Sequence, residues 1–136
     1  MHKYSVSVTH KFRGTGVALV TPFNNDGSID FTGLNKLINH VIDGGVEYLV
    51  AMGTTGESAT LSEQERFEII DFTLAASNGR VPVVGGFGGN NTMEIIHSIQ
   101  RYKSHCSGKK YIDAILIASP YYNKPSQEGI YQHYIA

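Results

Sequence analysis

A short β-rich run that recurs along the chain is the feature that most constrains how this sequence can fold. Four such runs begin at residues 17, 48, 81 and 114, so the intervals between them are 31, 33 and 33 residues. The runs cover residues 17–20, 48–52, 81–84 and 114–118 and are almost wholly apolar, which is typical of strands covered on both faces. The spacing leaves room for one helix between successive strands.

Amphipathic stretches fill these intervals, with apolar residues at the spacing of a helical stripe. The three stripes consist of Leu34, Leu37, Ile38, Val41 and Ile42; Phe67, Ile70 and Leu74; and Ile95, Ile96, Ile99 and Tyr102. Helix starts are indicated by the capping-box pair Ser62 and Glu65 and by the N-cap candidates Asp30, Asn91 and Ser126. Glycines at positions 44–45, 79 and 108 follow the helical stretches, where left-handed C-caps are expected.

This alternation of strand and helix predicts parallel strands joined by right-handed crossovers. Eight units of about 32 residues give about 250 residues, the usual size of a (β/α)8 barrel. We therefore predict an α/β TIM-barrel fold, with its first four βα units in residues 14–136. An open, doubly wound sheet has the same alternation and stays a structural alternative. The last residues, 133–136, lie inside a helical pattern, which predicts that the chain is a fragment of a longer protein.

Residues 1–13 are polar and basic and lack the apolar segment of a secretory signal, so we expect a disordered leader. The net charge of −1 gives no electrostatic reason for a nucleic-acid or anionic-membrane partner, and no apolar run approaches the ~20 residues of a membrane-spanning helix. The single cysteine, Cys106, rules out an internal disulfide framework and favours a reducing compartment. We expect a cytoplasmic protein.

The loops that follow the strands are the places where chemistry is expected, because reactive groups cluster at the carboxyl ends of parallel strands. Residues 53–58, GTTGES, combine two glycines with two adjacent threonines, which suits a carboxylate or phosphate and equally suits a tight turn. The glycine-rich residues 85–91 lack the spacing of a nucleotide-binding loop. Tyr121 and Tyr122 could supply a phenol for proton transfer, or could pack at a rim or subunit contact.

Other candidate chemistry is not supported by the sequence. The six histidines show no metal-ligand spacing, so no metal site is expected. Cys106 has no neighbouring base and is expected to be an inert thiol.

Four stretches carry a family resemblance: GTGVALVTPF (14–23), GTTGESATL (53–61), GRVPV (79–83) and SPYYNKPSQEG (119–129). At these stretches the chain resembles the dihydrodipicolinate synthase and N-acetylneuraminate lyase superfamily, from about residue 12 to residue 136. The runs GESATLS (56–62) and YYNKPSQEG (121–129) are more specifically similar to the 4-hydroxy-tetrahydrodipicolinate synthase family.

The resemblance implies a class I aldolase-type lyase without a cofactor. A lysine forms a Schiff base with pyruvate, and the enamine attacks L-aspartate 4-semialdehyde on the path to diaminopimelate and lysine. Thr54 and Tyr122 match the family's proton-relay residues, and Thr55 matches the group that holds the pyruvate carboxylate. Tyr122 is expected to reach the site of a neighbouring subunit, which implies a homodimer, often paired into a homotetramer.

The resemblance also implies an allosteric site for L-lysine as an inhibitor. Its positions in this chain are Ser58, Ala59, Asn90, Glu94 and Tyr121. Two nearby positions, Glu63 and Arg66, depart from the histidines of strongly lysine-sensitive members, so the response to lysine is left open.

None of the lysines of this sequence matches the Schiff-base position, so that lysine is expected outside these 136 residues and the chain alone is expected to be inactive. Two other functions stay open. One is an N-acetylneuraminate lyase or another pyruvate-dependent sugar-acid aldolase on the same scaffold. The other, of a different class, is a non-catalytic half-barrel that binds a ligand.

Overall fold

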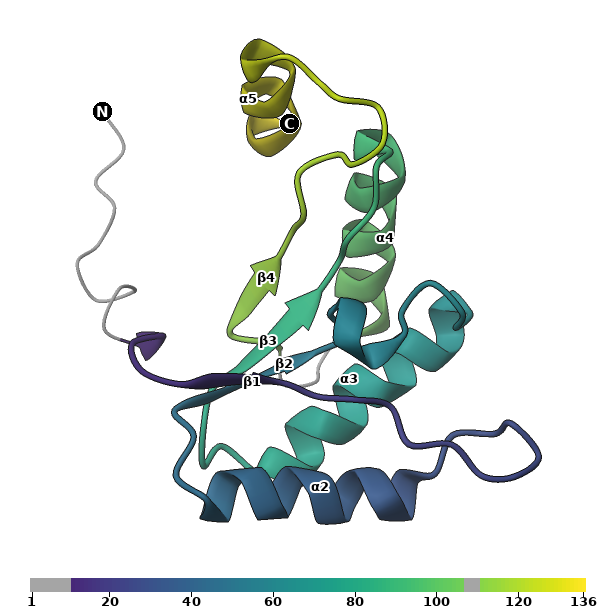
Figure 1. Ribbon diagram of the computed structural model, residues 1–136, viewed down its shortest axis with the longest axis vertical. Helices are drawn as coiled ribbons and strands as arrows, with labels where there is room; N and C mark the ends of the chain where they lie inside the picture. The colour runs from purple at the N-terminus through teal and green to yellow at the C-terminus, as the bar shows by residue number, and fades with distance from the viewer. Residues whose placement is uncertain (1–10, 107–110) are drawn as a thin grey trace.

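The computed structural model of the chain describes residues 11–106 and 111–136. Its four strands are β1 (Gly16–Ala18), β2 (Tyr48–Ala51), β3 (Val83–Gly86) and β4 (Ala114–Leu116). The helices are α2 (Phe31–Asp43), the 3-10 helix η1 (Thr54–Gly56), α3 (Glu63–Ser77), α4 (Thr92–His105) and α5 (Gln127–Ile135). Strand and helix thus alternate as the sequence predicts (Figure 1).

The four strands form one parallel sheet in the order β1-β2-β3-β4, so each strand pairs with its neighbours in the sequence. Val17 lies opposite Leu49, Leu49 opposite Val83, and Gly85 opposite Ile115. A doubly wound sheet reverses its strand order at a switch point. The four described strands show no such reversal, and their order is that of consecutive strands in a barrel wall.

The four predicted N-caps are confirmed. The side chains of Asp30, Ser62, Asn91 and Ser126 each accept a hydrogen bond from a backbone N–H three residues later. Around Ser62 both halves of the capping box are present, since Glu65 Oε2 also accepts from the Ser62 backbone N–H at 2.8 Å. These bonds satisfy N–H groups that would otherwise lack an intrahelical partner.

The C-terminal ends of the helices differ from the prediction in detail. After α2, Gly44 is still right-handed (φ −71°), and Gly45 has the positive φ of 90°. After α3 the left-handed cap is Asn78 (φ 49°), one residue before Gly79, which also has a positive φ. Asparagine tolerates this conformation because its short side chain bonds locally. Gly108 lies outside the described residues.

The core lies between the sheet and α2, α3 and α4. Leu49, Ala51 and Val83 point to this side of the sheet and are buried. The helices contribute Leu34, Ile38, Phe67, Ile69, Ile70, Leu74, Ile95 and Tyr102 to the same cluster. Each large side chain buried in this way stabilises the fold by about 1.5–3 kcal/mol. The helices therefore cover one face of the sheet, as they do outside a barrel wall.

The opposite face of the sheet is less covered. Ala18, Val50, Val84 and Ala114 lie in one register row on this face. Ala18 is exposed and Val50 and Ala114 are half-buried, while Leu116, two residues beyond Ala114 in β4, is 50% exposed. In a (β/α)8 barrel this face is the packed interior.

The first described residues lie against the amino-terminal ends of the strands. Lys11 forms an ion pair with Asp113, and the ring of Phe12 lies edge-on to Tyr48, 5.6 Å between centroids. Residues 1–10 of the predicted leader lie outside the described residues, and the predicted boundary at residue 13 stays a prediction.

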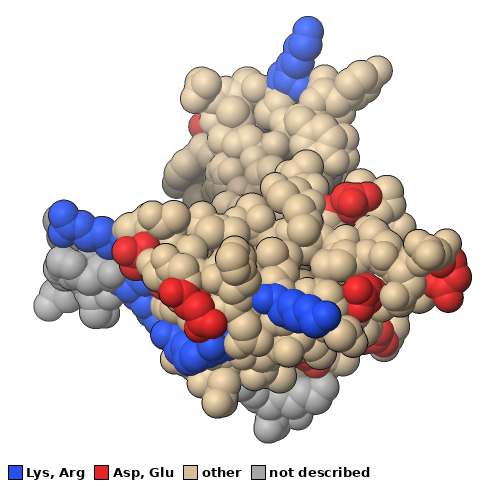
Figure 2. Space-filling model, turned by 60° about the horizontal axis from the view of Figure 1, so that its bottom comes forward, with Lys and Arg blue, Asp and Glu red and all other residues tan. Residues whose placement is uncertain are grey.

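Acidic and basic side chains are intermingled on the face shown in Figure 2. No helix in the described part of the chain has both the length and the apolar character needed to cross a membrane.

Candidate active site

The loop after β2 is held in an unusual backbone conformation. Met52 has a left-handed φ of 58° immediately before the loop, and Glu57 has a φ of 57° where η1 ends. The left-handed region costs a non-glycine residue about 1–2 kcal/mol. Such costs gather at functional sites, where the surrounding structure imposes the conformation.

The backbone conformation of the loop after β2 is imposed by two neighbouring segments, the end of β3 and the loop after β1. Gly86, at the end of β3, lies so close to Met52 that an added Cβ would be 2.1 Å from the Met52 carbonyl oxygen. From the other side, the buried hydroxyl of Thr21 donates to the carbonyl oxygen of Gly56 at 2.7 Å. The loops after β1, β2 and β3 are thus fixed to one another at the carboxyl ends of the strands.

A cavity of about 370 Å³ opens beside this loop. It is lined by Met52, Gly53, Thr54, Ser58, Ala59, Arg66, Gly86, Gly88, Gly89, Leu116, Ala118 and Tyr121. Four of the residues singled out in the sequence, Thr54, Ser58, Ala59 and Tyr121, are therefore brought together. Thr55 is exposed on η1 and is not among the lining residues.

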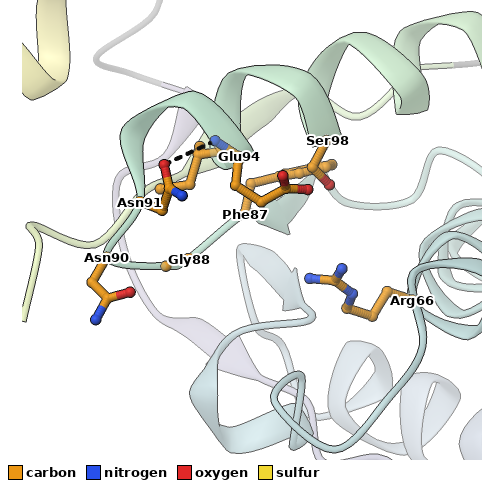
Figure 3. A pocket seen from close by; sticks show the side chains of 9 residues that line it. Arg66, Phe87, Gly88, Asn90, Asn91, Glu94 and Ser98 are labelled. Carbon is orange, nitrogen blue, oxygen red and sulfur yellow. Dashed lines mark hydrogen bonds between the residues drawn. The ribbon is translucent and has the colours of Figure 1, made fainter.

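A second cavity, of about 150 Å³, lies over the start of α4. It is lined by two more of the singled-out residues, Asn90 and Glu94, together with Arg66, Phe87, Gly88, Gly89, Asn91, Ile95 and Ser98. Arg66 reaches from α3 and lines both cavities. In Figure 3 its guanidinium points into the space below Glu94 and Phe87.

Arg66 is the site residue that sequence reasoning placed least well. In the sequence Arg66 stood out only as a departure from a family pattern. Its position beside the apolar Phe67 on α3 does not show which loop its side chain faces. The structure shows that its Nε is buried and has no hydrogen-bond partner among the described residues.

A charged network links α3 to α4 beside this cavity. Arg101 donates to both carboxylate oxygens of Glu63 at 2.7 Å and to Glu94 Oε1 at 2.7 Å. Glu63 Oε2 also accepts from the Ser98 hydroxyl at 3.0 Å. The bonds from Arg101 are the main reason that the pKa of Glu63 lies below its usual value, with smaller contributions from Ser98 and Arg66. Arg101 itself has a raised pKa for the same reason.

Tyr122 is not in either cavity. It has a left-handed φ of 69°, and 91% of its surface is exposed. The loop that carries it is joined to the loop before α4, because Asn90 Nδ2 donates to the Tyr121 carbonyl oxygen at 3.5 Å and Asn123 Nδ2 donates to the Asn90 carbonyl oxygen at 3.4 Å. Tyr121 thus faces the cavity beside Thr54, while Tyr122 faces solvent.

Among residues 11–106 and 111–136, no group of three or more His, Cys, Asp or Glu side chains is arranged to hold a metal ion. The four lysines in these ranges also lie away from both cavities. Lys11 pairs with Asp113, Lys36 and Lys103 lie on α2 and α4, and Lys124 lies in the exposed loop after Tyr122.

Consecutive parallel βα units in the order β1-β2-β3-β4, with candidate site residues beyond the carboxyl ends of the strands, are the arrangement of a (β/α)8 barrel wall. The sequence profile of the Dihydrodipicolinate synthetase family matches residues 11–136, and the chain belongs to this family.

Individual relatives agree. The chain is 55% identical over 123 residues to the 4-hydroxy-tetrahydrodipicolinate synthase of Flavobacterium psychrophilum, covering 90% of the chain and 40% of that protein. Its structure is similar to the dihydrodipicolinate synthase of Thermotoga maritima, with a TM-score of 0.83 and 40% identity over 92% of the chain and 40% of that structure. It is also similar to a chloride-inhibited dihydrodipicolinate synthase from Acinetobacter baumannii complexed with pyruvate, with a TM-score of 0.82 and 42% identity over 90% of the chain and 40% of that structure.

The chain spans about 40% of the length of the curated relatives it matches. Together with the strand order, these similarities confirm the predicted fold, the first four βα units of a (β/α)8 barrel.

Proposed function

We propose that the protein containing this chain is a 4-hydroxy-tetrahydrodipicolinate synthase, a lyase that condenses pyruvate with L-aspartate 4-semialdehyde. The observation that carries this proposal is 55% identity over 123 residues to a protein of that name, combined with a strand-end cavity lined by Thr54. N-acetylneuraminate lyase chemistry is less well supported, because the run of residues after Tyr122 resembles the 4-hydroxy-tetrahydrodipicolinate synthase family.

The proposed reaction begins with an amine supplied by a lysine outside these 136 residues. The amine attacks the keto carbon of pyruvate and water leaves, which gives a protonated imine. The imine withdraws electrons from the methyl group, so that a methyl proton can leave and the resulting enamine can attack the aldehyde carbon. No cofactor is needed, because the imine itself is the electron sink.

In this proposal the chain supplies the groups that bind and move protons. Thr54 and Tyr122 pass protons to and from the reacting atoms, a general acid–base task. Thr55 binds the pyruvate carboxylate through its hydroxyl and the nearby backbone N–H groups. The close contact between Met52 and Gly86 supports these roles, because it fixes the loop on which both threonines lie.

We further propose that the catalytic unit is a homodimer, with a homotetramer as the assembly. The exposure of Tyr122 supports this arrangement, since a phenol that faces away from its own cavity is available to the site of a partner subunit. A cytoplasmic location agrees with the single cysteine and with biosynthetic chemistry.

Finally, we propose that Ser58, Ala59, Asn90, Glu94 and Tyr121 belong to an effector site. All five line the two cavities that meet at Arg66. The resemblance implies L-lysine as the effector of this family.

Trapping with borohydride tests the enzymatic proposal. Full-length protein treated with pyruvate and borohydride should gain the mass of one reduced pyruvate adduct per subunit on a lysine, whereas borohydride alone should add nothing. Activity should appear with pyruvate and L-aspartate 4-semialdehyde and not with sialic acid. Failure to trap an adduct would overturn the Schiff-base assignment, and activity with sialic acid would favour the aldolase alternative.

A further inference from the structure

The buried histidine of α5 bonds to two separate segments of the chain. His133 Nε2 lies 3.2 Å from the carbonyl oxygen of Ala118, and His133 Nδ1 lies 2.7 Å from the hydroxyl oxygen of Thr92. The residue is only 8% exposed. α5 thus lies beyond the carboxyl end of β4 and beside the first turn of α4 (Figure 1). His133 therefore joins the end of β4 to the start of α4.

The two partners of this ring fix the direction of both hydrogen bonds. A carbonyl oxygen can only accept, so His133 Nε2 carries a proton and donates to Ala118. In the neutral ring Nδ1 then has a bare lone pair, which accepts from the hydroxyl of Thr92. A side chain that replaces this histidine must therefore supply one donor and one acceptor, each on the correct side.

The carbonyl group that His133 holds belongs to the wall of the cavity that contains Thr54. Ala118 is one of the residues that line this cavity, and Tyr122 follows it four residues later. Residues 119–120 between them are Ser-Pro, and a proline fixes its own φ and restricts the residue before it. A shift at Ala118 is therefore passed on to Tyr122, because the segment between them has little freedom to compensate.

The hydroxyl group that His133 holds belongs to the second anchor of the same loop. Thr92 lies two residues after Asn90, and Asn90 Nδ2 donates to the Tyr121 carbonyl oxygen at 3.5 Å. Asn123 Nδ2 donates in turn to the Asn90 carbonyl oxygen at 3.4 Å. Both bonds are long, so a small shift of the start of α4 relative to β4 would break them. The ring of His133 fixes that relative position.

We infer that His133 is a positioning residue for Tyr122, because its ring sets the distance between the two anchors of the loop and so the direction of the phenol. This inference rests on the proposed function, in which Tyr122 moves protons. The left-handed φ of 69° at Tyr122 agrees with it, since a tyrosine adopts that conformation only where its surroundings impose it. A misplacement of about 1 Å can cost about 100-fold in rate.

Substitutions in the full-length protein test this inference. His133→Leu removes both ring hydrogen bonds and should lower kcat about tenfold or more, while the KM for pyruvate changes little. His133→Gln should recover most of the lost kcat, because its amide supplies one donor and one acceptor. His97→Leu, which changes an exposed histidine of α4, is the matched control and should leave kcat unchanged.

A double-mutant cycle separates positioning from a general loss of structure. In a Tyr122→Phe background the phenol is already absent, so His133→Leu should lower the remaining kcat by less than about twofold. A purely structural role would lower kcat by the same factor in both backgrounds. If His133→Leu does not fold by circular dichroism, Thr92→Val takes its place, because it removes the hydroxyl that bonds to Nδ1. Thr92→Ser should then restore kcat.

Hydrogen exchange gives a second readout that does not depend on activity. The backbone amides of residues 117–123 should exchange about tenfold or more faster in His133→Leu and in Thr92→Val than in wild type. The same amides should be unchanged in His97→Leu. Mass spectrometry of peptides that cover this segment measures the difference.

The inference fails if exchange in residues 117–123 is unchanged, if His133→Leu keeps wild-type kcat, or if its loss of kcat is equal in both backgrounds. It also fails if His133→Gln is as impaired as His133→Leu. Pyruvate trapping is scored separately on the wild-type protein. An adduct with unchanged exchange in the variants would overturn this inference alone. Faster exchange without an adduct would overturn the proposed reaction and leave the anchoring of the loop by His133 in place.

Discussion

Met52 and Gly86 form the contact that shapes the candidate active site. Met52 adopts a left-handed backbone, and its carbonyl lies where any side chain on Gly86 would have to go. Neither residue is conspicuous in the sequence, where Met52 ends an apolar run and Gly86 is one glycine among several. Their importance comes from a close approach between two strand ends, which depends on the register of β2 and β3.

A single methyl group at position 86 should therefore be costly. Gly86→Ala places a Cβ 2.1 Å from backbone, which can move only if β2 and β3 separate, so we expect a loss of about 1–3 kcal/mol or more in the free energy of unfolding. Gly88→Ala is the matched control, because a Cβ there meets nothing within 4 Å. Denaturant unfolding of the two full-length variants measures the difference, and equal stabilities would contradict the account of this contact.

Thr54 provides a test at the level of catalysis. Thr54→Val keeps the shape of the side chain and removes the hydroxyl, so the proposed relay should lose about 100-fold or more in kcat. The melting temperature should hardly change, because Thr54 is exposed and its side chain lies at the cavity. Steady-state kinetics with pyruvate and the semialdehyde, beside a thermal melt, separate the two effects. Wild-type kcat in the variant would remove Thr54 from the relay.

At the scale of helices and strands, local chemistry predicted most of what the structure contains. All four N-caps follow from a side-chain oxygen placed before an apolar stripe, and the capping box at Ser62 and Glu65 is complete. The C-terminal cap of α3 was displaced by one residue, to Asn78, because asparagine can replace glycine in the left-handed region. Because asparagine and glycine can both occupy the left-handed cap, the sequence alone does not fix the last residue of such a helix.

The candidate site was predictable only in part. Thr54 and Tyr121 lie in the loops that follow β2 and β4, so their arrival at one cavity follows from parallel topology. The outward direction of Tyr122 and the inward direction of Arg66 depend on loop backbone and on the packing of α3 against the loop before α4. Both directions are set by contacts between segments, so the sequence pattern of a single segment does not predict them.

The capping box permits a quantitative test on α3. Ser62→Ala removes the oxygen that accepts from the Glu65 backbone N–H and should cost about 1 kcal/mol in the free energy of unfolding. Ser104→Ala is a suitable comparison, because Ser104 is exposed and its hydroxyl only donates to the Gln100 carbonyl oxygen of its own helix. Denaturant titrations should show a loss for the first variant and little change for the second. A neutral Ser62→Ala would mean that solvent replaces the cap.

The link between α3 and α4 should make stability depend on pH. Because the pKa of Glu63 is lower in the folded protein, its stabilising contribution is present above its unfolded value and is lost as the pH falls through the folded value. Glu63→Gln should therefore lower the melting temperature at neutral pH, and the difference from wild type should shrink as the pH falls below about 4. Glu68→Gln, an exposed change five residues further along α3, should change the melting temperature little at neutral pH. Parallel melting curves for both variants and wild type would contradict this account.

For the whole molecule, the two sides of the sheet differ in how well they are covered. One side packs against α2, α3 and α4 in a continuous core. On the other, Ala18 and Leu116 are exposed, and the outer edges of β1 and β4 have no strand partner among the described residues. Exposed apolar faces and open edges promote association.

The 136-residue polypeptide expressed alone should therefore behave differently from the full-length protein. It should bind a hydrophobic dye such as ANS, elute from size exclusion as a mixture of associated species, and lack synthase activity. The full-length protein should bind little dye and elute as a single assembly. A monomeric, dye-free 136-residue species would instead favour an independent ligand-binding half-barrel.

The order of the strands also bears on how the protein is made. Neighbouring strands of the sheet are about 30 residues apart in the sequence, so each strand pairs with one that is close to it along the chain. At a synthesis rate of roughly 5–20 residues per second, each new strand emerges from the ribosome within several seconds of its partner. The sheet can grow by one unit at a time during translation, and the Met52–Gly86 contact closes as soon as β3 has docked. The loop that carries Thr54 is then already shaped before β4 is synthesised.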